Sequence, residues 1–350
     1  MKEGVIVTGA AGFIGSYLVK RLLRDTDYFV YGVDNLSCGF MENVNDILAN
    51  PNFCFALRDI RNLTNGKIVE NDRNPLDAYD KVDWKYIFHF AARGEVYWCK
   101  DNPNEAVDIN VGGTVTMLEL AKELEIDHFF FADTSAEYDS LTEKMYFPST
   151  ELMAPNITTP MGFYPITKMA ASQFVRSYGK KNKFGTTLFR YTNVYGPSMN
   201  LERDIPPVVG SFTNKMLFKN EKAIIYGDGS KRRDFLHIDD LTDFHMKVLE
   251  KRGKNKDTET YNAASGKNWS IKEIHELVYD ACSSIVDTVP SEIEYRPNQL
   301  DEAKDTLADI SKATKELNWS PTISIKHGIE DTVGQLYTKH LQLRNIVLWP

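Results

Sequence analysis

Tyr164 and Lys168 are the pair whose types and spacing most directly suggest catalysis in this 350-residue chain. Proline is tolerated in the first turn of a helix, so Pro165 predicts a helix that begins at about Tyr164. Residues four apart share one helix face, and an ammonium beside a phenol lowers the pKa of the phenol. The pair therefore predicts a tyrosine that acts as an acid or base, whereas an isolated Tyr-x-x-x-Lys is more often a surface tyrosine beside a solvated lysine.

A strand-end serine and glutamate form the second candidate group. The apolar run His128 to Ala132 predicts a buried strand, and Ser135 and Glu137 follow its carboxyl end. Ligands of parallel sheets bind at the carboxyl ends of the strands, so we expect both side chains near a ligand. The sequence leaves two interpretations of Glu137 open: a catalytic role, or a ligand of a substrate hydroxyl or a turn-forming residue.

The elements that would position these groups begin with a glycine-rich turn. The run from Val5 predicts a buried strand that leads through Gly9, Gly12 and Gly15 into a helix. Glycines permit a sharp turn and a close approach to a ligand, and the first N–H groups of the helix point toward the gap. We expect a pyrophosphate there, at the three glycines and the intervening Phe13 and Ile14, rather than a turn that merely needs glycine.

Asp34 indicates which dinucleotide binds. It ends a second short strand, Val30 to Val33, about 20 residues after Gly15, where a carboxylate would accept hydrogen bonds from ribose hydroxyls. A carboxylate repels a 2′-phosphate, and no arginine lies between Asp34 and Gly39. The sequence therefore predicts NAD rather than NADP as cofactor, bound by Asp34 and the adjacent Asn35.

A third strand is expected to reach the adenine end of the dinucleotide. The run Phe40 to Asn50 looks helical, Phe53 to Leu57 predicts the strand, and Gly66 to Lys85 is polar and loop-like. Asp59 and Ile60 follow the strand, where they would hold the adenine amino group and pack on its face. Asp59 as a simple cap of the next turn is an equally good interpretation.

The next elements complete the cofactor side. Tyr86 to Ala92 predicts a fourth strand, whose small terminal residues Ala91 and Ala92 would let a dinucleotide lie against it. Helical spacing from Asn104 to Glu125 places Asn110 where that helix would pass the site. Strands that alternate with helices predict an α/β fold with a doubly wound parallel sheet.

Composition excludes several classes of function. The formal charge of −8 argues against a nucleic-acid partner, and no apolar run approaches the ~20 residues of a membrane span. Met1-Lys2-Glu3 leads directly into the first strand, so we expect no signal peptide and a cytoplasmic protein. The four cysteines are scattered and the seven histidines lack metal-ligand spacing, which predicts reduced thiols and no metal site.

Taken together, these motifs resemble the extended short-chain dehydrogenase/reductases, specifically the NAD-dependent nucleotide-sugar epimerase/dehydratase family, over nearly the whole chain. The resemblance implies that Ser135, Tyr164 and Lys168 form the family's catalytic triad on a Rossmann-type sheet. The segment Phe189 to Pro197 looks like the family's strand and turn in which an asparagine, here Asn193, contacts the nucleotide diphosphate.

Further substrate contacts follow from the same resemblance. The segment Ile225 to Asp240 is similar to one whose arginine, here Arg233, grips the diphosphate, and Tyr226 lies at its start. Many family members carry one more arginine before the C-terminal signature; here Gln299 stands at that position and Arg296 three residues earlier. Cys99 stands where the family commonly has serine, which suggests an atypical sugar.

The resemblance also implies an architecture. Residues 1–190, with 234–261 returning, would form the NAD-binding Rossmann domain. Residues 191–350 would form a smaller mixed α/β lobe that binds a nucleotide-sugar, with the site in the cleft between the lobes. Family members usually dimerise through the helices at about 104–125 and 164–182, so we expect a homodimer.

The expected reaction begins when Tyr164 removes a proton from a sugar hydroxyl while hydride leaves the same carbon, which yields a 4-ketosugar. A 4-epimerase acting on a UDP-hexose or UDP-hexuronate needs the fewest further catalytic groups, so we expect this reaction. A 4,6-dehydratase or UDP-glucuronate decarboxylase would use Glu137, but Ala136 stands where dehydratases carry a residue that supplies a proton. A non-catalytic dinucleotide-binding regulator is the alternative from another class, although it would not need the intact triad.

Overall fold

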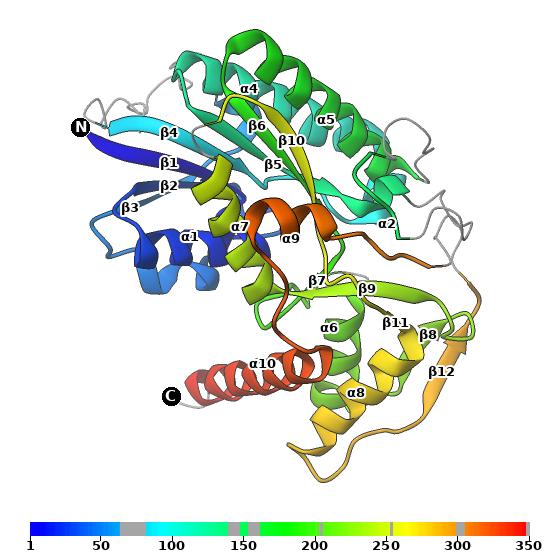
Figure 1. Ribbon diagram of the computed structural model, residues 1–350. Coiled ribbons are helices and arrows are strands. Elements are labelled where there is room, and N and C mark those ends of the chain that lie inside the picture. Colours follow the sequence, from blue (N-terminus) through cyan, green and yellow to red (C-terminus); the bar gives the residue numbers. More distant parts are fainter. Residues whose placement is uncertain are drawn as a thin grey trace.

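A sheet of seven parallel strands is the frame of the computed structural model (Figure 1), which describes residues 1–63, 82–138, 148–152, 162–201, 203, 206–252, 255–298 and 305–347. Its strands are β1 (Lys2–Thr8), β2 (Phe29–Asp34), β3 (Phe53–Leu57), β4 (Val82–His89), β5 (His128–Thr134), β6 (Gly185–Tyr191) and β10 (Thr258–Ala263). They lie in the order β10-β6-β5-β4-β1-β2-β3. The predicted doubly wound sheet is confirmed.

Helices cover both faces of this sheet (Figure 1). One face carries α1 (Phe13–Asp25), α7 (Ile238–Arg252) and α9 (Ser311–Leu317); the other carries α4 (Gly113–Glu123) and α5 (Phe163–Asn182). The strands are rich in buried apolar residues because both of their faces are covered. None of the described helices is long and apolar enough to cross a bilayer.

Two predicted helices differ from the structure. The run Phe40 to Asn50 forms two short 3-10 turns, Met41–Asn43 and Asn45–Ile47. A regular helix does not form because asparagine side chains in this run make hydrogen bonds with backbone groups. The predicted helix Asn104 to Glu125 is divided into α3 (Pro103–Val107), a π-helical turn (Asp108–Gly112) and α4. Such π turns are frequent at functional sites.

Strand β4 begins earlier than the sequence pattern indicated. Val82 and Trp84 alternate with polar residues, and Trp84 is buried, so the strand starts at Val82 within the stretch expected to be a loop. The remainder of that stretch, up to residue 81, lies outside the described residues.

The second lobe has two small sheets and a core of its own. Strands β7 (Asn193–Tyr195), β9 (Arg232–His237) and β11 (Asn268–Ser270) form one sheet, and β8 (Ala223–Tyr226) pairs with β12 (Ile293–Arg296) in the other. Helices α6 (Val208–Thr213), α8 (Ile271–Ser283) and α10 (Ile325–Val347) pack with these strands. A capping box at Ser270 and Glu273 fixes the start of α8.

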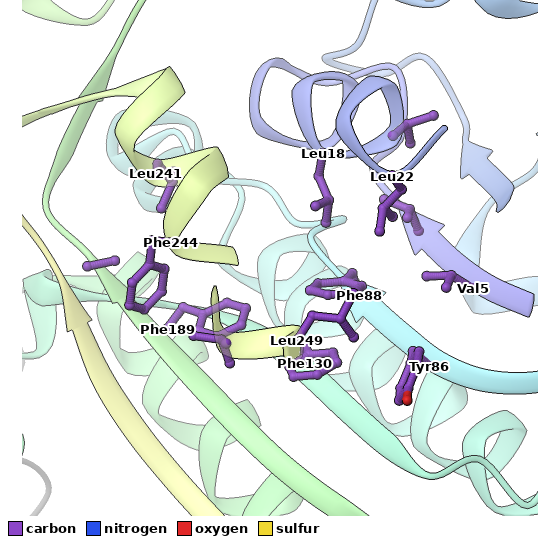
Figure 2. Close-up of a cluster of buried hydrophobic side chains, with 14 of the residues drawn as sticks. Val5, Leu18, Leu22, Tyr86, Phe88, Phe130, Phe189, Leu241, Phe244 and Leu249 are labelled. Carbon is purple, nitrogen blue, oxygen red and sulfur yellow. The ribbon is translucent and has the colours of Figure 1, made fainter. Parts of the chain in front are cut away.

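The chain returns to the first lobe twice. Helix α7 and strand β10 add to the sheet's helix layer and edge, and α9 with Trp319 then packs into the same core as Phe244 (Figure 2 shows this core). The two aromatic rings meet edge to face with centroids 5.0 Å apart. The division expected at residue 190 did not anticipate this second return, which depends on a short helix and one tryptophan.

Replacing Trp319 by alanine should destabilise the fold strongly. The side chain is 2% exposed, so truncation leaves a cavity between α7 and α9 and should lower the free energy of unfolding by about 3–5 kcal/mol in chemical denaturation. The control is Leu48→Ala, whose side chain is 45% exposed and whose effect should stay within about 0.5 kcal/mol. Equal effects of the two substitutions would contradict the described docking of this segment.

Candidate active site

A cavity of about 810 Å³ lies at the carboxyl ends of the central strands and is lined from both lobes. The chain leaves β1 toward β2 on one side of the sheet and reaches β4 on the other, so the cavity opens where the strand order reverses. Ligands of open α/β sheets bind at this switch point. The described part of the chain contains no group of three or more side chains that could hold a metal ion there.

The glycine turn forms one wall of this cavity. Gly9 has φ +70°, and a Cβ there would lie 2.9 Å from the backbone nitrogen of Ala91. A Cβ on Gly15 would clash with the Gly9 carbonyl oxygen. Helix α1 starts at Phe13 and no side chain caps it, so its first N–H groups remain available to an anion. This cradle fits the pyrophosphate of a dinucleotide.

Asp34 faces the same cavity from the end of β2. Its Oδ2 accepts a hydrogen bond from the Ala11 N–H at 3.0 Å and its Oδ1 accepts one from the Leu36 N–H at 2.8 Å. Backbone N–H groups of Gly12 and Asn35 also act on this carboxylate, which lines the cavity where ribose hydroxyls would bind. Asn35 and Ile60 also line the cavity.

Asp59 caps the turn after β3, as one of its two interpretations predicts, and it also lines the cavity. Its Oδ1 accepts a hydrogen bond from the Arg61 N–H at 2.9 Å and caps the turn Ile60–Asn62, yet the residue also lines the cavity. Hydrogen bonds from the Arg61 side chain are the main reason why the pKa of Asp59 is lowered to about 2. The carboxylate is therefore charged near the predicted adenine end.

Ser135, Tyr164 and Lys168 all line the cavity. Helix α5 begins at Phe163, as Pro165 predicted, and presents Tyr164 and Lys168 one turn apart. The Lys168 ammonium lies 4.1 Å from the centre of the Phe131 ring, and burial lowers the pKa of Lys168 to about 8 although Asp133 and Glu137 oppose this shift. The three polar groups meet at the end of β5 and the start of α5.

The expected low pKa of the Tyr164 phenol is not found. Burial raises the pKa of Tyr164 above its ordinary value, more than the Thr134 hydroxyl lowers it. The reason is that Lys168 is itself buried over an aromatic ring, so the phenol gains little from it in the protein alone.

Glu137 does not face the cavity. It is fully buried in a 3-10 turn (Ser135–Tyr138), and its carboxylate lies 3.1 Å from the Arg190 guanidinium, which also lies 3.6 Å from Asp133. Burial and the nearby Asp133 raise the pKa of Glu137 to about 9, although Arg190 opposes this shift. Glu137 is part of this turn, as the turn-forming interpretation expects, and in this structure it does not reach the cavity as a base or hydroxyl ligand would. Ala136, in contrast, lines the cavity.

The second lobe contributes three of the four predicted substrate residues. Asn193, Tyr226 and Arg233 line the cavity. Arg296 does not: its side chain is 45% exposed and pairs with Glu294 at 2.7 Å, because it sits at the outer end of the edge strand β12. Gln299, the other candidate at this position, lies outside the described residues.

Asn110 supports the cavity wall without lining it, while Ala91 and Ala92 do line it. The buried Asn110 side chain accepts a hydrogen bond from the Arg93 N–H at 2.8 Å and donates one to Thr167 at 2.9 Å. It therefore joins the loop after β4 to helix α5, and a direct contact between Asn110 and the cofactor stays a prediction.

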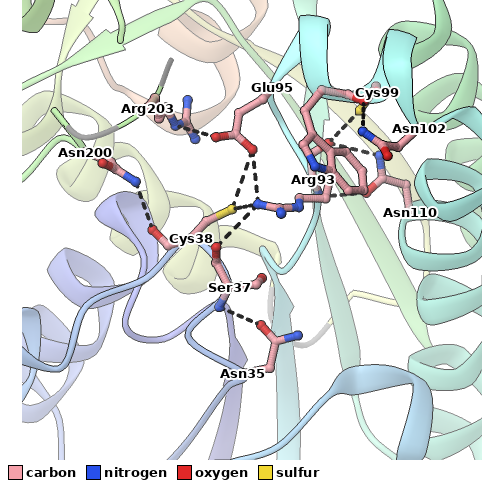
Figure 3. Close-up of polar contacts among 11 residues, drawn as sticks. Asn35, Ser37, Cys38, Arg93, Glu95, Cys99, Asn102, Asn110, Asn200 and Arg203 are labelled. Atoms are coloured by element: carbon pink, nitrogen blue, oxygen red, sulfur yellow. Dashed lines mark hydrogen bonds and ion pairs between the residues drawn. The ribbon is translucent and has the colours of Figure 1, made fainter. Parts of the chain in front are cut away.

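Sequence reasoning missed a charged cluster on the wall. Arg93, Glu95 and Arg203 line the cavity, and each of the two arginines forms an ion pair with Glu95 (Figure 3). Arg93 and Glu95 directly follow the predicted strand end at Ala92, and this position was the available signal. Arg203 comes from the second lobe, and no local pattern connects it to the other two.

Comparison with known proteins assigns the family. Residues 5–264 match the model of the NAD dependent epimerase/dehydratase family. The chain is 31% identical to a UDP-glucuronate 4-epimerase of Thermodesulfobacterium geofontis, over 94% of each chain. It is 29% identical to the human dTDP-D-glucose 4,6-dehydratase, over 94% of this chain and 88% of that protein.

A solved structure supports the same relation. The UDP-glucose 4-epimerase of Thermotoga maritima, solved with UDP-glucose, superposes with a TM-score of 0.82. The match covers 97% of this chain and 99% of that chain at 28% identity.

Glu137→Gln should change how stability depends on pH. A carboxyl whose pKa is raised on folding contributes stability below its unfolded pKa, near 4.5, and that contribution disappears as pH rises toward the folded value of about 9. Relative to the variant, the wild-type free energy of unfolding should therefore fall by at least about 1 kcal/mol between pH 5.5 and 8.5. Parallel pH profiles of the two proteins would show instead that Glu137 is not held protonated by its surroundings.

Proposed function

Because the chain belongs to the NAD-dependent epimerase/dehydratase family, we propose that it inverts C4 of the sugar in a nucleotide-sugar, with NAD as cofactor and a 4-ketosugar as transient intermediate. UDP-linked hexoses or hexuronic acids are the proposed substrates. Relatives named for UDP-glucose and UDP-glucuronate, at 28% and 31% identity over nearly the full chain, support this choice.

The cofactor would be held along the carboxyl ends of β1, β2 and β4. The open N–H groups at the start of α1 suit its pyrophosphate, and Asp34 suits the adenosine ribose. Asp59 and Ile60 lie where the adenine would bind, and Ala91 and Ala92 leave space against β4. NAD bound in this way would accept a hydride from the sugar and return it.

Tyr164 is the proposed acid and base. Its phenolate would take the proton from the C4 hydroxyl, and its phenol would give the proton back to the ketone oxygen after the sugar has turned over. Ser135 lies on the same wall and would orient that hydroxyl. Burial raises the pKa of Tyr164, and Lys168 lowers it little in the protein alone, so the phenolate would have to form once NAD and substrate are bound.

The substrate's diphosphate would be bound from the second lobe. Arg233, with its planar set of donors, and the Asn193 amide line the cavity opposite the glycine turn. Tyr226 lines the same wall. An anchored diphosphate leaves the sugar free to rotate and present either face, which C4 inversion requires.

The observation that carries this proposal is the position of Glu137. A 4,6-dehydratase or UDP-glucuronate decarboxylase would use Glu137 at the sugar, but the carboxylate lies away from the cavity against Arg190. Ala136, which does line the wall, has no proton to supply. Epimerisation needs neither group, so the arrangement favours it. A non-catalytic dinucleotide-binding regulator would leave the convergence of Ser135, Tyr164 and Lys168 without a purpose.

Purified protein incubated with UDP-, GDP-, dTDP- and CDP-hexoses and hexuronic acids should convert at least one UDP-sugar to its C4 epimer of unchanged mass, as read by NMR. Tyr164→Phe should lower kcat by about 10²–10⁴-fold, because it removes the acid and base. Calorimetry should show that this variant still binds NAD, since the phenol oxygen is its only loss.

Two results would contradict the proposal. The first is a product that has lost water or carbon dioxide. The second is the absence of turnover on the whole panel by a protein that binds both NAD and UDP-sugars, which would favour the regulator.

We also propose that the protein is a homodimer. Ile166 and Phe174 are exposed apolar residues two turns apart on α5, and Val107 on α3 is 52% exposed. Exposed apolar residues on neighbouring helices are typical of an interface between copies. Phe174→Glu should therefore convert a dimer to a monomer in light scattering, and a wild-type monomer would contradict the proposal.

We propose a cytoplasmic location because the cysteines are free thiols. All four cysteines are free, and Cys99 and Cys282 are buried. Free thiols are typical of proteins from reducing compartments.

A further inference from the structure

Glu95 is the centre of a charged cluster in the wall of the cavity (Figure 3). Its Oε2 lies 3.1 Å from Nη1 of Arg93, and its Oε1 lies 3.4 Å from Nε of Arg203. Two guanidinium groups therefore share one carboxylate, which leaves one positive charge uncompensated within the cluster. That charge faces the space where the proposed substrate binds.

Arg93 has several neighbours, which its Nη1 contacts. Besides Glu95, its guanidinium donates to the Cys38 sulfur and to the Ser37 carbonyl oxygen, and it lies 4.3 Å from the centre of the Trp98 ring. These contacts join the loop after β2 to the loop after β4. Arg93 thus acts as a structural partner of Glu95, and the uncompensated charge is that of Arg203.

Arg203 has few partners. Within the described part of the chain, Glu95 is its only ion-pair partner, and its Nε is enclosed without a hydrogen bond. Its side chain is 27% exposed and lines the cavity. The neighbouring Asn200 donates a hydrogen bond to the Cys38 carbonyl oxygen at 3.4 Å, so this segment of the second lobe is held against the first. The terminal nitrogens of Arg203 are thus positioned to receive an anion.

The electrostatic effect of Arg203 places it near the reacting end of the cavity. Burial is the main influence on the pKa of Tyr164 and raises it, while the charge of Arg203 acts in the opposite direction. Arg203 therefore lies within electrostatic reach of the phenol that would deprotonate the sugar. The diphosphate has its own proposed cation, Arg233 on β9, so Arg203 is left to a different anionic group.

We propose that Arg203, oriented by Glu95, binds a carboxylate on the sugar ring, so that the substrate is a nucleotide-linked hexuronic acid rather than a neutral hexose. The inference rests on the proposed function, because that function places the sugar at Tyr164. A guanidinium and a carboxylate form paired, charge-assisted hydrogen bonds. A neutral hydroxymethyl group at the same position would supply no second carboxylate to the two arginines that share Glu95.

UDP-glucuronate and UDP-glucose differ only at C6 and provide the test. Both are titrated by calorimetry into the NAD-loaded Tyr164→Phe variant, in which no turnover disturbs the binding. UDP-glucuronate should bind at least about tenfold more tightly. Adding Arg203→Gln should weaken the binding of UDP-glucuronate by about 10- to 100-fold and leave the affinity for UDP-glucose nearly unchanged. Arg203→Lys should keep part of the preference, because the charge remains but the paired geometry is lost.

Arg233→Gln is the matched control, since it should weaken the binding of both UDP-sugars by a similar factor. Equal binding of the two nucleotides, or an equal loss of both on Arg203→Gln, would overturn the inference. Turnover by the wild type separates the two proposals. If the protein epimerises UDP-glucose but does not bind UDP-glucuronate, the proposed epimerase activity is supported and the role of Arg203 is overturned. Tight UDP-glucuronate binding followed by loss of carbon dioxide would support Arg203 and overturn the epimerase.

Discussion

The close approach of the glycine turn to the end of β4 is the constraint on which the site depends. Gly9 adopts φ +70° with its α-carbon against the backbone of Ala91, and a side chain there would separate two strands at the point where the sheet order reverses. Because the turn is this tight, α1 starts directly behind it with uncapped N–H groups. The same geometry places the loop after β4, with Arg93 and Glu95, along the edge of the cavity.

Two groups of charged side chains lie at or beside the cavity wall, and they have different consequences. Arg190 lies within ion-pair distance of Asp133 and Glu137, and Glu137, unlike Asp133, does not line the cavity. On the wall, Glu95 is shared by two arginines, which leaves a positive charge toward the ligand. The first arrangement argues against elimination chemistry, and the second argues for an acidic sugar. The effect of each charged side chain thus depends on whether it points toward the cavity or away from it.

The sequence was most informative where one local pattern determines one local structure. The glycine spacing, Asp34 at a strand end and Pro165 before Lys168 each report on a single turn, and the structure places all of them at the cavity. Glu137 was misplaced because the direction of a side chain in a 3-10 turn depends on Arg190, which is distant in sequence. Arg203 and Trp319 were missed for the same reason, since each acts through contacts between segments far apart in the chain.

The most direct test of the central claim, that only C4 of the sugar reacts, is turnover in deuterated water with the product analysed by NMR and mass spectrometry. With Glu137 held by Arg190 and Ala136 on the wall, no described group at this position can exchange the C5 proton. The account predicts a C4-inverted product of unchanged mass with no deuterium at C5. Deuterium at C5, together with loss of water or carbon dioxide, would contradict it and place Glu137 at the sugar during the reaction.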